Sequence, residues 1–234
     1  MTTFLSFLKP LITQPNRKQI SGIKAFVFLL CLIPLSRLVW LGFQDNLSAN
    51  PIEFIERSTG FWALLILLAT LSLTPIKLIT GRAWQIQLRR MLGLYMFFYA
   101  CLHIMTYIWL DFDFNWADIT KDIVKHPRIL VGFAAFVLAI PLAITSNNAM
   151  VRRLRERWKQ LHQLVYFIAI LAVVHFWWLV KKDIREPLLY AAILAVLFGI
   201  RIYYKKFAKK TVGKYVKKPI MGNESINESS PISS

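Results

Sequence analysis

FYACLHIMTY, residues 98–107, places a histidine in the middle of an apolar run. The run extends from about residue 91 to about residue 110, which is the length that an α-helix needs to cross a bilayer. An imidazole in hydrocarbon must find a hydrogen-bond partner, a metal or an aqueous cavity. The chemistry of His103 therefore depends on which other residues reach the same depth.

Five further apolar runs of similar length occur in the 234 residues, so the sequence predicts an all-α, polytopic membrane bundle of six transmembrane helices. The chain is 56% hydrophobic, above the roughly 45–50% of soluble proteins. The alternating pattern of a membrane barrel is missing, and backbone that faces lipid must hydrogen-bond within its own helix. No internal repeat is visible. The predicted spans are, in chain order, 25–43, 60–76, 91–110, 129–144, 161–180 and 188–204.

Lysine and arginine are concentrated on one side of the predicted spans. They occupy the N-terminal segment 1–24, the second and fourth loops, and the C-terminal end from Arg201 onward. The last segment, 205–234, begins basic and ends as a polar tail that is predicted to be disordered. Positively charged loops face the cytoplasm, so both termini are predicted to be cytoplasmic. The net charge of +17 is then a topology signal and a contact for membrane lipid, and no nucleic-acid binding is expected.

Two of the four histidines are predicted to lie at matched depth on different spans. His103 is about 12 residues past the start of the third span and His175 about 14 past the start of the fifth, which runs the same way. Two imidazoles at one level can ligate a haem iron from both faces. The alternative is that each imidazole hydrogen-bonds to a backbone carbonyl or a neighbouring helix. His126, in an outer loop, is expected to be solvated.

His162 begins the fifth span, 13 residues before His175, which is about 20 Å along a helix. An ideal helix leaves these rings roughly 140° apart in azimuth, so a kink or π-bulge would be needed to bring both onto one haem face. The corresponding level of the third span carries Arg89 and Arg90 and no histidine. The arginines would bind a haem propionate, a flavin phosphate or a lipid phosphate, or only anchor the helix end. His162 would ligate a second haem or, as we favour, serve a flavin or quinone as a hydrogen-bonding or proton-relaying group.

Four segments carry a resemblance to a known family. They are RRMLGLYMFFYACLHIMTY (89–107), WKQLHQLVYFIAILAVVHF (158–176), STGFWALLILLATLSLTPIKLI (58–79) and TSNNAMVRRLRERWKQLH (145–162). With the six-span layout, they resemble the MsrQ (YedZ) family, the haem-binding membrane subunits of periplasmic methionine sulfoxide reductase systems, within the ferric-reductase-like transmembrane group. The resemblance covers nearly the whole chain up to about residue 210.

The resemblance implies that residues 25–204 form a ferric-reductase-like haem domain in the bacterial inner membrane. The protein would be a b-type cytochrome, with one haem b expected and a second left open, and the family is also described as containing FMN. It would pass electrons from the quinone pool, through quinol or a separate flavin reductase, to a periplasmic molybdenum-containing reductase (MsrP-like) that repairs oxidised methionine. Its haem-associated histidines would be His103, His162 and His175, and its paired arginines Arg89 and Arg90.

The sequence differs from those of larger members of the group, which carry an additional dehydrogenase domain. Only about 30 residues follow the sixth span and no GxGxxG motif occurs, so this chain is expected to be an electron-transfer subunit with an outside donor. Two other function classes stay open: a haem-free transporter and a structural membrane-anchor subunit. A transporter would place carboxylates or broken helices near the midplane, whereas no acidic residue falls inside a predicted span and Arg37 is the only obvious full charge there.

Overall fold

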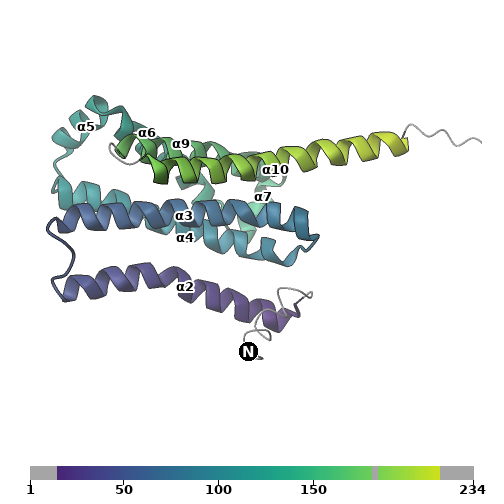
Figure 1. Cartoon of the computed structure of the whole chain (residues 1–234), viewed down its shortest axis with the longest axis horizontal. Helices are drawn as coiled ribbons and strands as arrows, with labels where there is room; N and C mark the ends of the chain where they lie inside the picture. The colour runs from purple at the N-terminus through teal and green to yellow at the C-terminus, as the bar shows by residue number, and fades with distance from the viewer. Residues whose placement is uncertain (1–14, 181–183, 217–234) are drawn as a thin grey trace, which may run out of the picture.

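The computed structural model describes residues 15–180 and 184–216, with side chains up to residue 206, and this part of the chain forms helices joined by short turns, without a strand (Figure 1). Six segments are long and apolar enough to cross a membrane. Each overlaps one predicted span, so the prediction of an all-α bundle with six transmembrane helices is confirmed. The segments are Arg17–Phe43, Pro51–Thr80, Trp84–Asp111, Pro127–Ile144, Glu156–Leu179 and Arg185–Lys206.

Four spans are single helices and two are composite. The single helices are α2 (Arg17–Phe43), α3 (Pro51–Thr80), α6 (Pro127–Ile144) and α10 (Arg185–Val216). The third span joins the 3-10 segment η1 (Trp84–Leu88), α4 (Arg89–Met105) and the π-helical η2 (Thr106–Asp111). The fifth span joins α8 (Glu156–His162) and α9 (Leu164–Leu179). Two short helices flank α6 in the chain, α5 (Trp116–Lys125) and α7 (Asn148–Leu154).

The first two helices begin earlier than predicted because capping residues start them. Asn16 caps α2 in a capping box, so the helix takes over the last part of the predicted N-terminal segment 1–24. Asn50 caps α3 by accepting a hydrogen bond from the backbone of Glu53. α3 therefore includes Glu53 and Glu56. The expectation that no acidic residue lies in a span is wrong at the ends of four spans, which also contain Asp111, Glu156 and Glu186.

The last helix runs further than predicted. α10 continues to Val216, so the beginning of the predicted tail 205–234 is helical. The remaining residues, 217–234, for which we predict disorder, lie outside the described residues.

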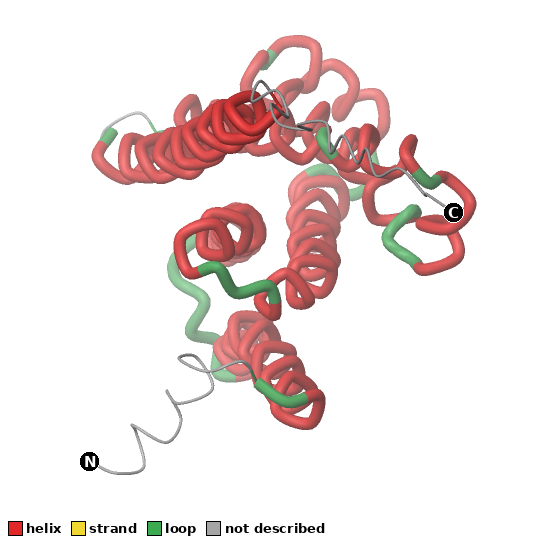
Figure 2. Tube along the Cα trace, turned by 90° about the vertical axis from the view of Figure 1, so that its right-hand side faces the viewer, coloured by secondary structure: helices red, strands yellow, loops and turns green. Residues whose placement is uncertain are grey.

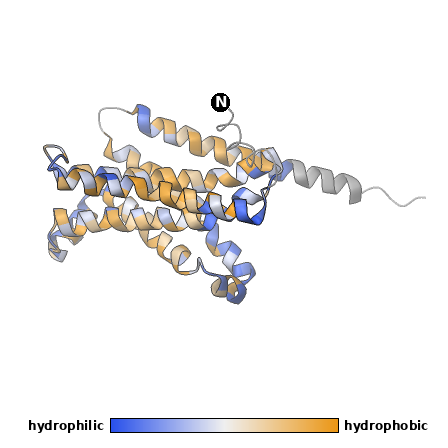
Figure 3. Ribbon diagram, turned by 90° about the horizontal axis from the view of Figure 1, so that it is seen from below, coloured by the Kyte–Doolittle hydropathy of each residue, from blue (hydrophilic) through white to orange (hydrophobic). Residues whose placement is uncertain are grey.

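Basic loops lie at one end of the bundle and acidic loops at the other. The basic end holds the start of α2, the α3–α4 connection and the arginine-rich α7 and α8, and α10 projects beyond it (Figure 1). The opposite, acidic end holds the α2–α3 loop and α5, with Glu53, Glu56, Asp118 and Asp122. Figure 3 shows hydrophobic residues along the middle of the helices and hydrophilic residues towards the ends. The basic end is the one predicted to face the cytoplasm.

Two helix pairs form the centre of the bundle. α3 packs along α4, α6 packs along α9, and α10 covers α3 and α9. Leu71, Tyr99 and Ala169 are fully buried between these helices. The outer faces expose large apolar side chains, such as Leu29 at 62% and Phe43 at 84%, which a lipid bilayer would cover.

α2 lies at one edge of the bundle (Figure 2). A tyrosine from α4 attaches it to the other helices. Pro34 has no N–H group, so α2 lacks one of its own hydrogen bonds at this point. The buried Tyr99 hydroxyl lies 2.7 Å from the carbonyl oxygen of Cys31 and 3.2 Å from the backbone nitrogen of Leu35, on either side of the proline. The interrupted turn of α2 therefore binds α4 through its own backbone.

Candidate functional site

The structure brings together the two histidines that we predicted to lie at one depth. His103 comes from α4 and His175 from α9, and their ring centres are 6.2 Å apart with the ring planes at 73°. Both side chains are partly buried within the bundle, towards its acidic end. The pair is formed by helices that are far apart in sequence, so it depends on the whole fold.

Each imidazole is held by a backbone carbonyl of the neighbouring helix. His103 Nδ1 lies 2.9 Å from the carbonyl oxygen of Glu56 on α3, and His175 Nδ1 lies 2.7 Å from that of Arg128 on α6. A carbonyl oxygen only accepts, so Nδ1 carries the hydrogen in both rings. The Nε2 lone pair is then available to a metal. The sequence analysis treats a hydrogen bond to a carbonyl as the alternative to metal ligation. In this geometry each imidazole can do both, the first through Nδ1 and the second through Nε2.

A glycine lies against each imidazole. A Cβ atom built at Gly60 on α3 would be 3.0 Å from His103 Cε1, and one built at Gly132 on α6 would be 2.6 Å from His175 Cε1. Both imidazoles therefore occupy space that any other residue would fill. The sequence analysis missed both glycines, since neither belongs to a recognisable motif.

The two halves of the site repeat one arrangement. His103 follows its carbonyl partner Glu56 by 47 residues, and His175 follows Arg128 by the same 47. In each half the glycine lies about one helical turn after the residue whose carbonyl accepts the hydrogen bond from the histidine. The expectation of no internal repeat concerns the sequence, and the arrangement that occurs twice here is local to the two histidines. The equal spacing joins each histidine to a backbone carbonyl, so the residue types in the sequence do not reveal it.

The separation of the rings suits two ligands on one metal ion. Bonds of about 2 Å from metal to nitrogen, and about 1.1 Å from each nitrogen to its ring centre, place two opposed ring centres about 6 Å apart. Within the described residues, no group of three or more His, Cys, Asp or Glu side chains is arranged to hold a metal. A metal between His103 and His175 would take its other ligands from a macrocycle, as haem iron does.

His162 belongs to a different site near the basic end. Its Nε2 lies 3.0 Å from Thr145 Oγ1, and its ring stacks on Trp158 with 4.0 Å between centres. The Thr145 hydroxyl donates its hydrogen to the carbonyl of Pro141, so it accepts from His162 Nε2. The helix is interrupted at Gln163, directly after this histidine. The break between α8 and α9 therefore lies between His162 and His175, in the segment where the sequence analysis considered a kink or π-bulge. Among the described residues, no second histidine lies opposite His162.

The adjacent residues Arg89 and Arg90 have different neighbours in the structure. Arg90 Nη1 donates to Asn148 Oδ1 at 2.7 Å and so ties α4 to α7. Arg89 is partly buried and lies close enough to His162 and to Arg201 of α10 to act electrostatically on both. The two arginines therefore have different surroundings. Arg201 is a further residue that the sequence analysis left among the basic residues of the C-terminal end.

The acidic end carries a hydrogen-bonded cluster that includes His126. Its Nδ1 lies 2.8 Å from Asp122 Oδ1, and Asp122 Oδ2 accepts from the hydroxyl of Tyr107 at 2.8 Å. The His126 side chain is 40% exposed, so the expectation of a simply solvated histidine is only partly right. A hollow of about 350 Å³ lies beside this cluster, lined by His126, Pro127, Arg128 and Trp178. Arg128 is the residue whose carbonyl holds His175.

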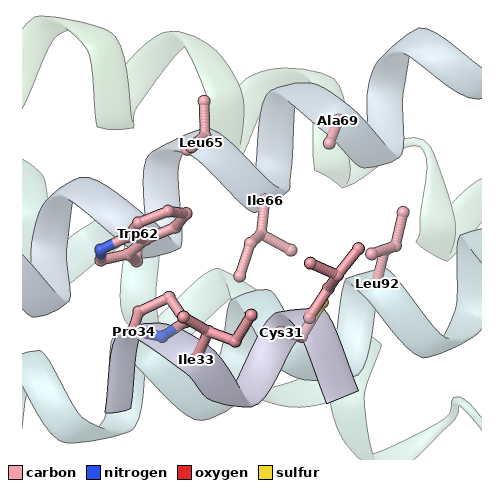
Figure 4. Close-up of a pocket in the computed structure, with 9 residues that line it drawn as sticks. Cys31, Ile33, Pro34, Trp62, Leu65, Ile66, Ala69 and Leu92 are labelled. Atoms are coloured by element: carbon pink, nitrogen blue, oxygen red, sulfur yellow. The ribbon is translucent and has the colours of Figure 1, made fainter. Parts of the chain in front are cut away.

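A second hollow, of about 300 Å³, lies between α2, α3 and α4 (Figure 4). Its walls are almost entirely hydrocarbon, and in a membrane it would accommodate an apolar chain. The residues that line it are Leu30, Cys31, Ile33, Pro34, Trp62, Leu65, Ile66, Ala69 and Leu92.

Comparisons with known proteins find relatives that match most of this chain. The family described as "Ferric reductase like transmembrane component" matches residues 59–173, a range that contains His103 and His162. The "Protein-methionine-sulfoxide reductase heme-binding subunit MsrQ" of Herminiimonas arsenicoxydans is 49% identical over 193 residues, which cover 81% of this chain and 88% of the relative. Subunits of the same name from Xanthomonas campestris pv. campestris (strain B100) and Ralstonia nicotianae are 48% and 50% identical, over 87% and 80% of this chain and 97% and 88% of the relatives. No solved structure matches the chain.

Proposed function

The chain belongs to the MsrQ family of haem-binding subunits of protein-methionine-sulfoxide reductases, and from this premise we propose that it is a b-type cytochrome of the bacterial inner membrane. It passes electrons from the quinone pool to a periplasmic molybdenum-containing methionine sulfoxide reductase (MsrP-like). The observation that carries the proposal is the pair His103 and His175, whose rings are 6.2 Å apart with both Nε2 atoms available. The chain acts as the electron-transfer subunit, and its partner carries out the repair of oxidised methionine.

His103 and His175 are the proposed axial ligands of one haem b. When bound, haem supplies a one-electron couple whose potential depends on its axial ligands and on the surrounding dielectric. The protein fixes both rings through the carbonyls of Glu56 and Arg128, which sets the tautomer and increases the basicity of Nε2. Gly60 and Gly132 leave the rings room beside the helix backbones.

The acidic end is the proposed periplasmic side and the exit for electrons. The hollow beside Arg128 and Trp178 lies next to the turn that holds His175, so a partner docked there would approach the haem closely. The basic end then faces the cytoplasm, as the distribution of lysine and arginine favours.

For His162 we propose a role in binding a flavin or quinone, and not in ligating a second haem. Its Nε2 hydrogen is donated to Thr145, which supports a hydrogen-bonding or proton-relaying role towards a flavin such as FMN or a quinone. Arg89 lies in the same neighbourhood and suits a phosphate or propionate oxygen, whereas Arg90 is engaged with Asn148. A second haem, ligated by His162, is the alternative.

A haem assay on the purified chain tests the proposal. The pyridine haemochrome of protein extracted from bacterial membranes should be that of haem b, with at least one haem per chain. A quinol should reduce it, and addition of an oxidised MsrP-like partner with methionine sulfoxide should reoxidise it. A colourless protein that inserts normally would contradict the proposal and favour the transporter or the membrane-anchor subunit.

A further inference from the structure

Arg201 is a charged side chain held inside the sixth membrane span. Its Nη1 donates to the hydroxyl of Tyr166 on α9, and its Nη2 donates to the carbonyl of Leu71 on α3. The guanidinium carbon lies 5.0 Å from the centre of the Tyr166 ring. Leu71 is fully buried and Arg201 itself is partly buried, so the charge lies between three helices and not in the basic tail.

All of these contacts are with neutral groups. Among the described residues no carboxylate forms an ion pair with Arg201, and its buried Nε has no hydrogen-bond partner. A guanidinium has five N–H donors, and the two bonds leave the others to be satisfied. Taking an unpaired charge out of water is unfavourable, so a counter-charge is expected.

A second positive charge near Arg201 increases the need for a negatively charged partner. Arg89 is close enough to Arg201 for the two positive charges to repel each other, and it has no hydrogen bond or ion pair with a described residue. Arg89 on α4 and Arg201 on α10, with no described carboxylate paired to either, form an electropositive site that is incomplete without an anion.

Other unsatisfied polar atoms lie at the same end of the bundle. Within the described part of the chain, the buried side-chain atoms without a partner besides Arg201 Nε are Thr74 Oγ1, Trp84 Nε1 and Gln85 Oε1. Thr74 is one turn beyond Leu71 on α3, and Trp84 and Gln85 belong to η1, which precedes Arg89. Buried polar groups in a native protein are satisfied by a partner, water or a ligand.

We propose that Arg201, together with Arg89, binds the oxyanion of an amphipathic ligand, either a phosphate or a carboxylate. The planar guanidinium matches the oxygens of both groups, and its Nε and one Nη hydrogen can bind them side by side. The apolar neighbours of Arg201, which include Leu71 and the Phe198 ring packed edge-on against Tyr166, favour a ligand whose remainder is hydrophobic. The oxyanion comes from a phospholipid headgroup or from the acidic group of a bound cofactor. This site is distinct from the His103–His175 pair, and the inference does not rest on haem ligation there.

The test compares the full-length chain with Arg201→Met, and takes Arg37→Met as the matched control because Arg37 is an exposed charge on α2. Native mass spectrometry with added phosphatidylglycerol measures lipid binding, and haem and flavin contents per chain measure cofactors. Loss of charge-assisted hydrogen bonds should weaken binding of one ligand by roughly tenfold or more. Weaker phosphatidylglycerol binding with unchanged haem and flavin identifies a lipid, and loss of haem or flavin identifies a cofactor. The control should keep all three.

Unchanged binding of all three in Arg201→Met would overturn the proposal, and a higher thermal midpoint would give the reason. It would show a solitary buried charge whose removal stabilises the protein. If that variant does not insert, Arg201→Lys decides, because it keeps the charge and loses the planar fork. It should bind the same ligand more weakly than the parent, and parental binding of lipid, haem and flavin would equally overturn the proposal. The optical spectrum of each sample reports the His103–His175 pair separately.

Discussion

Gly132 lies directly against the imidazole of His175, and a Cβ atom at this position would be only 2.6 Å from Cε1 of the ring. Gly60 and His103 repeat the relationship in the other half of the bundle, at 3.0 Å. Real Cβ atoms do not approach a ring as closely as 2.6 Å, so a methyl group at Gly132 must displace the histidine or the helix, whereas at Gly60 a small shift of the His103 ring would suffice.

Replacing Gly132 by alanine should therefore weaken haem binding. Overpacking costs about 1–3 kcal/mol, which corresponds to roughly 5- to 150-fold in affinity. Gly60→Ala should have a smaller effect because its contact is longer. Haem-to-protein ratios of the purified variants measure both. Gly93→Ala is the matched control, since nothing lies within 4 Å of a Cβ built there on α4. A parental haem content in Gly132→Ala would show that the histidine is not required in its present position.

Removing the hydroxyl of Tyr99 should loosen α2 without affecting the haem site. Tyr99→Phe leaves the backbone around Pro34 without its partner in the bundle. An unsatisfied buried group costs about 1–3 kcal/mol, so the thermal midpoint should fall and α2 should become more accessible to protease. The optical spectrum should stay parental. Loss of haem in this variant would show that α2 supports the histidine pair, contrary to its position at the edge of the bundle.

His162→Ala should keep the haem content of the parent and slow reduction by the donor. The reason is that His162 Nε2 is engaged with Thr145, and no second histidine lies opposite among the described residues. Thr145→Val removes the same hydrogen bond and leaves the imidazole in place, so it should show a milder form of the same defect. Stopped-flow reduction by quinol and haem quantitation together measure the effect. Halving of the haem-to-protein ratio in His162→Ala would establish a second haem there.

The sequence predicted the six spans and the matched depth of His103 and His175 in the membrane, because apolar length and a rise of about 1.5 Å per residue are local properties. Helix starts were less accurate, since Asn16 and Asn50 begin helices before the apolar runs do. The carbonyls of Glu56 and Arg128 could not be predicted, because backbone groups carry no residue signal. Arg201 was missed for a different reason. Its position near the end of the sixth span looked like positive-inside anchoring, and only the packing of α10 on α3 and α9 shows it to be partly buried.

The most direct test of the central claim is the visible spectrum of His103→Ala and His175→Ala, each compared with the parent in purified membranes. Two imidazoles on one iron require both residues, so either substitution should abolish most haem binding while immunoblots show that the protein still inserts. The low-spin b-type bands, a Soret band and a reducible α-band, should be present in the parent and lost in both variants. A full low-spin b-type spectrum in either variant would contradict the assignment of this pair as the haem ligands.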